Sequence, residues 1–531
     1  MPEPLHFRGL MLDAARLVEP LSYYRRFIDF CAAWDVNTVI FRVTDDQGCA
    51  IRFRSHPELL THPNALSPDQ VRELVGYARA HGVELLPEVE SFGHTHYITG
   101  TPEYAQLSDR AAMGGGAEGE DWAEGVIPLH PQTMQILGDL YREVAELFPY
   151  PYLHGGCDEV NWGASDFSAR LLSTKKRSQV WGEYLNALQR SALDLGKEFM
   201  VWGDHVLRNQ PDILDYLDRR IIILDWEYAD TDPITIAAMA ERAIAKGFRI
   251  AGAPALQWAR WGPRVGSDQL RNVDAFVDVY RTLQSPLALG VVVTNWVPSR
   301  YLQNAIWDSL AYAATAMSRG STSAREETFV RFVRRHYEAN WSAAWADVFR
   351  LLYGFMPPKR YASGDIPFVV PWADEQALSA AVTHRLRLQP PFMELRASLE
   401  RAAPAVRGNR MDFDALRLTV EYLEHITWRH RIVAVQARQA ASDPAEAEDL
   451  IRDIAERDAL IAAKLRQDWS AGRDPSGVDE ADGPGRSAAF DLGPKERLVD
   501  HFLAAARFSG ELARDPARFA GILRLALGGR G

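Results

Sequence analysis

The feature that most constrains the fold is a regular alternation of short apolar runs and amphipathic stretches between residues 7 and 318. Each apolar run has the length of a buried strand, and the stretch that follows it has helical spacing. Strands are predicted at residues 7–13, 38–44, 83–90, 152–158, 198–202, 221–226, 248–253 and 289–296. Eight strand–helix units are the number that a closed barrel requires. The sequence therefore predicts an α/β chain in which residues 1–320 form a (β/α)8 TIM barrel.

A doubly wound open sheet is the alternative arrangement of such units. An open sheet of that kind usually carries a glycine-rich nucleotide loop after its first strand. Here the first strand is followed by Asp13-Ala14-Ala15-Arg16, which cannot cradle a phosphate in that way. The sequence therefore favours the closed barrel.

The pattern changes after Gly320, where long stretches rich in alanine, leucine and arginine replace the strand-like runs. Their periodicity is that of helices. Residues 321–531 are therefore predicted to form a C-terminal all-α domain. Such a domain would pack on the barrel or on a second subunit, so a homo-oligomer is possible through this helical tail.

The composition narrows the classes of partner. A net charge of −12 argues against nucleic acid, and no apolar run is long enough to span a membrane. The three cysteines are widely spaced and form neither a disulfide framework nor a CxxC metal site. The first residues do not resemble a signal peptide. We expect a cytoplasmic protein that uses no cofactor and no metal.

Acids, histidines and aromatic residues gather at the predicted carboxyl ends of the strands, where the chemistry of a (β/α)8 barrel lies. Indole faces pack against pyranose rings, while carboxylates bond sugar hydroxyls. The pattern predicts a carbohydrate pocket. The residues assigned to substrate binding on this ground are Trp202, Asp204, Trp226 and Trp296.

The adjacent acids Asp158 and Glu159 stand at the predicted end of the fourth strand. Alone they would suit an exposed turn. Glycoside hydrolysis usually needs two carboxyl groups on opposite sides of the scissile bond, which neighbours in sequence cannot easily provide. They suit the substrate-assisted route, in which the sugar's 2-acetamido oxygen attacks the anomeric carbon. Glu159 is predicted to be the general acid and base, with a pKa raised by its neighbour, and Asp158 to hold the acetamido N–H.

Four motifs resemble those of glycoside hydrolase family 20, the β-N-acetylhexosaminidases. They lie in order along the chain, at residues 8–16, 44–48, 87–94 and 154–159. The resemblance implies that Arg8 binds the 3- and 4-hydroxyls of the sugar. It also implies that Asp45 and His94 form a chain of interacting side chains behind Glu159. It also adds His154 to the substrate site. Cys157 stands where the family usually has glycine, as in a hexosaminidase D-like branch.

The sequence departs from the family at the eighth strand. Residues 294–300 lack the Trp-x-Glu motif that would bind the 4- and 6-hydroxyls of the sugar. Both GlcNAc and GalNAc therefore stay candidates for the terminal sugar of the substrate. Tyr228 is the candidate for the tyrosine that holds the acetamido oxygen, with Trp258 and Trp261 as alternative pocket walls.

The leading hypothesis is an exo-acting β-N-acetylhexosaminidase that hydrolyses terminal N-acetyl-β-D-hexosaminides of small or oligosaccharide substrates. One alternative is a barrel that binds carbohydrate without turnover. Another is a metal-dependent hydrolase that uses His94 and His96, since His-x-His is a common metal spacing.

Overall fold

The computed structural model describes residues 5–109, 123–228, 230–257, 264–321, 325–355, 374–383, 392–473 and 498–528. Within these residues, eight parallel strands form a barrel that closes where β14 pairs with β1, Phe7 lying opposite Gly290. The strands in order are β1 (Phe7–Leu12), β2 (Thr38–Arg42), β6 (Glu84–Glu88), β8 (Tyr152–His154), β10 (Glu198–Trp202), β11 (Ile222–Trp226), β12 (Arg249–Ala253) and β14 (Ala288–Asn295). The predicted barrel is confirmed.

Side chains alternate between the two faces of each barrel strand. The inward set includes Met11, Ile40 and Met200, which pack together in the barrel interior. The outward set includes Leu10 and Val39, which pack against the surrounding helices in a second, larger cluster. Because both faces are apolar, these strands read as nearly continuous hydrophobic runs in the sequence.

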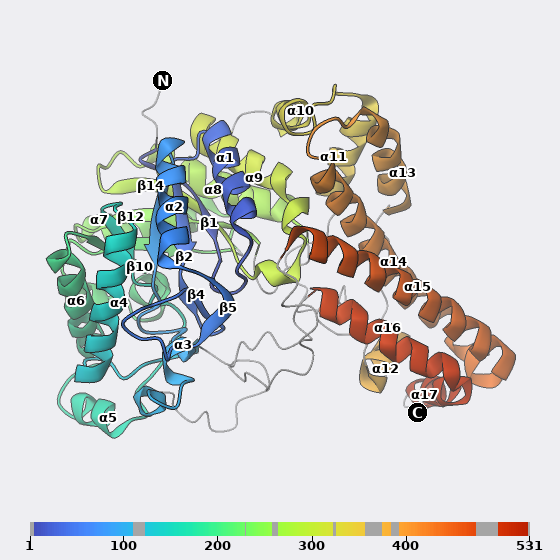
Figure 1. Ribbon diagram of the computed structural model, residues 1–531, viewed down its shortest axis with the longest axis horizontal. Coiled ribbons are helices and arrows are strands. Elements are labelled where there is room, and N and C mark those ends of the chain that lie inside the picture. Colours follow the sequence, from blue (N-terminus) through green and yellow to red (C-terminus); the bar gives the residue numbers. More distant parts are fainter. Residues whose placement is uncertain are drawn as a thin grey trace.

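Helices surround the barrel (Figure 1). They are α1 (Leu21–Ala33), α2 (Pro68–Ala80), α4 (Pro131–Leu147), α6 (Arg177–Asp194), α7 (Pro233–Ala245), α8 (Ser267–Thr282) and α9 (Trp307–Arg319). Ser67 caps α2 by accepting a hydrogen bond from the Gln70 N–H, and the Gln70 side chain bonds back to the Ser67 N–H. After β10 the structure has a wide turn, η2 (Asp204–Asn209), and a 3-10 turn, η3 (Pro211–Asp215). They occupy the place that a helix takes in a regular strand–helix unit.

The chain beyond the barrel is helical, as predicted, and its long helices extend away from the barrel on the right of Figure 1. No described helix has a stretch both long and apolar enough to cross a bilayer. A boundary between residues 320 and 321 remains a prediction. The helices are α10 (Arg325–His336), α11 (Ala343–Phe355), α12 (Glu375–Thr383), α13 (Phe392–Ala402), α14 (Arg410–Ser442), α15 (Pro444–Gly472), α16 (Leu498–Arg514) and α17 (Pro516–Gly528).

Ion pairs join the helical part to the barrel. Arg26 of α1 donates to both carboxylate oxygens of Asp412 in α14, at 2.8 and 2.7 Å. Arg473, at the end of α15, pairs with Glu19 at 3.1 Å and donates to the carbonyl oxygen of Tyr301 at 3.0 Å. Tyr301 belongs to the loop that follows β14, so the helical part fastens a loop on the barrel's carboxyl-end face.

Candidate active site

The turn that carries the two adjacent acids differs from the predicted strand. β8 ends at His154, and positive φ angles follow at Gly156 (64°), Cys157 (73°) and Glu159 (49°). The strand alternation assumed from the sequence therefore does not reach Asp158. Both carboxylates instead approach His94.

Hydrogen bonds hold this turn in its strained conformation. A non-glycine residue with positive φ needs support from its surroundings. Glu90 Oε2 accepts a bond from the Cys157 N–H at 3.0 Å, and Asp204 Oδ2 accepts one from the Glu159 N–H, also at 3.0 Å. At Gly156 a Cβ atom would lie 1.9 Å from Glu90 Oε2. The Glu90 carboxylate thus occupies the space that a side chain at Gly156 would need.

His94 lies between two pairs of acids. Its Nε2 is 3.3 Å from Glu159 Oε2 and 3.9 Å from Asp158 Oδ2. Its Nδ1 is 3.1 Å from Asp46 Oδ2 and 3.6 Å from Asp45 Oδ1. Burial acts to lower the pKa of His94, but the charges of Asp45 and Asp158 raise it well above its ordinary value. The surrounding acids therefore stabilise the protonated form of the imidazole.

The pKa of Glu159 corrects the prediction that its neighbour raises it. Burial acts to raise this pKa, but the hydrogen bond and the charge of His94 bring it below its ordinary value, helped by Arg16 and Arg42. The sequence argument counted only Asp158. The pKa of Asp158 itself is raised, mainly by burial.

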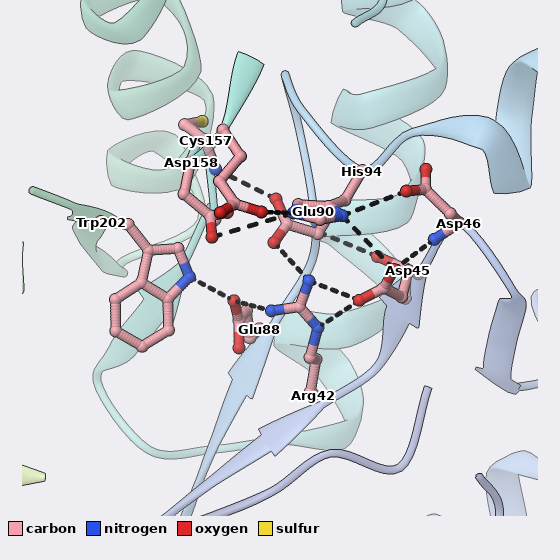
Figure 2. A network of polar contacts seen from close by, with 12 residues as sticks. Arg42, Asp45, Asp46, Glu88, Glu90, His94, Cys157, Asp158 and Trp202 are labelled. Carbon is pink, nitrogen blue, oxygen red and sulfur yellow. Dashed lines mark hydrogen bonds and ion pairs between the residues drawn. The ribbon is translucent and has the colours of Figure 1, made fainter. Parts of the chain in front are cut away.

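A buried arginine that the sequence analysis did not assign to the site lies beneath this turn. Figure 2 shows Arg42 among Asp45, Glu88 and Glu90. Its guanidinium is 2.6 Å from Asp45 Oδ2, 3.1 Å from Glu88 Oε1 and 2.7 Å from Glu90 Oε1. Burial raises the pKa of Glu88 to about 7 in spite of the arginine. The sequence signal for this cluster is Arg42 itself, a charged residue at the end of an otherwise apolar strand run.

Aromatic residues from three strands form the wall beside the acids. Trp202 Nε1 donates to Glu88 Oε1 at 2.7 Å, and its ring lies 5.6 Å from that of Trp296. Trp296 Nε1 donates to the Tyr228 hydroxyl at 2.7 Å, and Tyr228 stacks on Trp226 at 4.9 Å. The four aromatic side chains predicted for the pocket therefore come together. Trp258 and Trp261 lie outside the described residues.

Several buried polar atoms at the carboxyl ends of neighbouring strands have no hydrogen-bond partner in the described part of the chain. They are Asp158 Oδ1, Asp204 Oδ1, Trp226 Nε1 and both amide atoms of Asn295. Buried polar groups are normally satisfied, so a group of exceptions indicates a place where a polar ligand binds. Burial also raises the pKa of Asp204 to about 7.

The structure contradicts the role assigned to Arg8. This residue lies near the amino end of β1, where it donates to the carbonyl oxygens of Asp35 and Leu5 at 2.9 Å each. Arg16 follows the carboxyl end of the same strand, and its Nη2 is 3.1 Å from Asp45 Oδ2. Arg16 is thus the arginine of this motif that reaches the site, because only the carboxyl ends of the strands face it.

His154 is placed behind the pocket and not on its surface. It is fully buried, its Nδ1 accepts a bond from the Gly156 N–H at 2.9 Å, and its ring lies 4.4 Å from that of Trp202. Its contact with a substrate remains a prediction. Its position supports Trp202 and the start of the turn.

Two groups of described side chains lie close enough together to hold a cation. One contains Asp45, Asp46 and His94, and the other His94, Asp158 and Glu159. His96, the second histidine of the alternative metal site, belongs to neither of these groups of described side chains. The raised pKa of His94 also works against metal binding, because a ligating imidazole must be neutral.

Comparison with known proteins agrees with this geometry. Residues 5–257 match the family described as glycosyl hydrolase family 20, catalytic domain. A β-hexosaminidase of Vibrio furnissii is 28% identical over 227 residues, which are 37% of each chain. A β-hexosaminidase of Akkermansia muciniphila is 25% identical over 173 residues, which are 29% of this chain and 34% of that protein. The chain thus spans little more than a third of these relatives.

The barrel also resembles a solved structure. The β-N-acetylhexosaminidase of Bacteroides fragilis superposes with a TM-score of 0.50 at 18% identity, over 62% of this chain and 69% of that one. At this identity the likeness concerns the fold alone. The acidic turn and the aromatic wall both lie largely within residues 5–257, the part of the chain that matches the catalytic domain of glycosyl hydrolase family 20.

Proposed function

We propose that the protein is an exo-acting β-N-acetylhexosaminidase that hydrolyses terminal N-acetyl-β-D-hexosaminides with retention, by substrate-assisted catalysis. The observation that carries the proposal is the shared environment of Asp158 and Glu159. Both carboxylates approach the same nitrogen of His94, at 3.9 and 3.3 Å. Two acids on one side of a site cannot act as nucleophile and acid across a glycosidic bond. The nucleophile must then come from the substrate.

The contacts around Glu159 support its role as the general acid and base. The acetamido oxygen would attack the anomeric carbon while the bond to the leaving oxygen breaks, and Glu159 would protonate that oxygen. His94 Nε2 lies 3.3 Å from Glu159 Oε2, so a proton can pass between the two groups. In the second step Glu159 would deprotonate the water that opens the oxazolinium intermediate.

Asp158 is suited to hold the acetamido group. Its Oδ1 is buried and has no hydrogen-bond partner among the described residues, so it can accept a bond from the acetamido N–H. A carboxylate there would also stabilise the positive charge that develops on the oxazolinium ring. The wall formed by Trp202, Trp296 and Tyr228 supplies apolar faces for the sugar ring.

The test of the proposal is turnover of aryl N-acetyl-β-glucosaminides and N-acetyl-β-galactosaminides, with a plain aryl β-galactoside as the substrate that lacks the acetamido group. Glu159→Gln should lower kcat by about 10²–10⁴-fold, the usual contribution of a general acid. Glu241→Gln, an exposed acid on α7, is the matched control and should behave as wild type. Equal turnover by Glu159→Gln and wild type would falsify the assignment.

A second series tests substrate assistance separately from hydrolysis. Fluorine atoms on the N-acetyl group withdraw electrons from its oxygen and weaken it as a nucleophile. The kcat of the wild type should therefore fall from N-acetyl to N-fluoroacetyl to N-trifluoroacetyl substrates. A flat series with intact turnover would reject substrate assistance alone, and binding without turnover of any substrate would favour the carbohydrate-binding alternative. Activity lost on chelation would favour the metal-dependent one.

We further propose a cytoplasmic location and a place in a hexosaminidase D-like branch. Cys31, Cys49 and Cys157 are all free and buried, which supports a reducing compartment. Cys157 also stands at the motif position where glycine is usual. Fractionation of cells that express the tagged chain tests the location. The preference for GlcNAc, GalNAc or both is decided by the aryl substrate panel.

A further inference from the structure

We propose that Arg42 is a positioning residue that joins the catalytic turn, the aromatic wall and His94 into one rigid unit through three separate carboxylates. This inference rests on the proposed function, because it concerns the same site. Arg42 is fully buried and acts through the carboxylates that surround it. Figure 2 shows its guanidinium at the centre of the network.

The first connection runs to the turn that bears the acids. Arg42 Nη2 is 2.7 Å from Glu90 Oε1, and Glu90 Oε2 accepts the Cys157 N–H at 3.0 Å. Cys157 precedes Asp158 and has a φ of 73°. Glu90 is held at its other end by a bond from its N–H to Thr44 Oγ1 at 2.8 Å. Two polar contacts thus connect the guanidinium to the backbone that aims the catalytic pair.

The second connection runs to the wall of the pocket. Arg42 Nη1 is 3.1 Å from Glu88 Oε1, and the same oxygen accepts the Trp202 Nε1–H at 2.7 Å. The guanidinium carbon also lies 4.8 Å from the centre of the Trp296 ring. Arg42 therefore contacts one indole directly and orients another through Glu88.

The third connection runs to the histidine. Arg42 Nη2 is 2.6 Å from Asp45 Oδ2, and Asp45 Oδ1 is 3.6 Å from His94 Nδ1. Asp13 Oδ1 lies 3.7 Å from Arg42 Nε on the remaining side. Four buried carboxylates thus surround this one guanidinium within ion-pair distance.

Only arginine can make these contacts together. Its planar group offers five N–H donors in fixed directions, whereas the lysine ammonium is a compact charge with three. Without the cation, Asp45, Glu88 and Glu90 would face one another in a medium of low dielectric constant. They would take up protons or move apart, and either change would release the turn, the indole and the histidine.

The experiment compares kcat, KM and thermal midpoints of the wild type with those of Arg42→Met, Arg42→Lys, Glu90→Ala and Glu88→Ala, on an aryl N-acetyl-β-glucosaminide. Arg264→Met is the matched control, because Arg264 is also fully buried and paired, with Asp308 and Tyr353, away from the site. Arg42→Met should lose about 10²-fold in kcat, the cost of misplacing reacting groups by about 1 Å. Arg42→Lys should fall between it and the wild type.

Substitution of the two connecting acids, Glu90 and Glu88, should affect different kinetic constants. Glu90→Ala should lower kcat with little change in KM, because it frees the acidic turn. Glu88→Ala should mainly raise KM, because it removes the acceptor of the Trp202 N–H and frees the Trp202 wall. If Arg42 and its partners only stabilised the fold, both variants would have a lower thermal midpoint. Their effects on kcat and KM would then not differ in this way.

The proposal is overturned if folded Arg42→Met keeps wild-type kcat, or if Arg264→Met loses as much. If Arg42→Met does not fold, wild-type kcat in Glu90→Ala overturns it. A wild type without turnover rejects the proposed function instead. In that case a crystal structure of Glu90→Ala decides the positioning role: a displaced Cys157–Glu159 turn supports it, and an unmoved turn refutes it.

Discussion

Asp204→Asn probes a buried acid that supports the catalytic turn. Asp204 Oδ2 accepts the Glu159 N–H at 3.0 Å, and burial raises the pKa of Asp204 to about 7. An asparagine can keep this hydrogen bond through its carbonyl oxygen but cannot ionise. The substitution therefore removes a titration and leaves the geometry in place.

The magnitude follows from the difference in pKa between the folded and unfolded chains. An aspartate in an unfolded chain has a pKa near 3.9, so between about pH 4 and 7 the folded protein holds a proton that the unfolded chain has lost. A pKa that is higher in the folded state contributes stability that is complete below the unfolded value and is lost as the pH rises through the folded value. Between pH 5 and 8 this loss amounts to roughly 2 to 3 kcal/mol.

The assay is urea unfolding at pH 5, 6, 7 and 8, with the free energy of unfolding taken from the midpoint and the slope. The stability of Asp204→Asn relative to the wild type should rise by roughly 2 to 3 kcal/mol from pH 5 to 8. Asp212→Asn, an exposed acid in the adjacent η3 turn, should follow the wild type at every pH. Parallel pH curves for Asp204→Asn and the wild type would refute the reasoning.

Two further substitutions test the packing around the site. Gly93→Ala would place a Cβ 2.0 Å from the carbonyl oxygen of Asp158, so kcat should fall about 10²-fold as the backbone shifts. Gly76→Ala on α2 meets no atom within 4 Å and is its control in the same kinetic assay; equal kcat in the two variants would contradict the prediction. Arg473→Met leaves Glu19 without its buried ion-pair partner, which should cost about 3 to 5 kcal/mol in the free energy of unfolding. Urea unfolding measures this cost, and wild-type stability would show that the pair contributes nothing.

The barrel could be predicted because its strands are buried on both faces. The run predicted at residues 198–202 coincides with β10, and that at 248–253 begins one residue before β12. A continuous apolar run of five or six residues is enough to reveal such a strand. The run at 152–158 was predicted too long, because nothing local marks Cys157 and Glu159 for positive φ.

The candidate site was predictable in its residue types and less so in its geometry. The acids and tryptophans were found because each stands at the carboxyl end of an apolar run. Arg8 was preferred over Arg16 on the family resemblance alone, although the predicted strand at residues 7–13 places Arg16, and not Arg8, near its carboxyl end. The lowered pKa of Glu159 depends on His94, which lies far from it in the sequence, so no local pattern could predict it.

Closure of the barrel has a consequence for how this protein can be divided. The family match ends at residue 257, yet β14 (Ala288–Asn295) pairs with both β1 and β12. A fragment cut at the family boundary would therefore keep the acidic turn but expose two unpaired strand edges. Such edges are templates for aggregation. The part of the chain that matches the family is thus shorter than the part that forms the closed barrel.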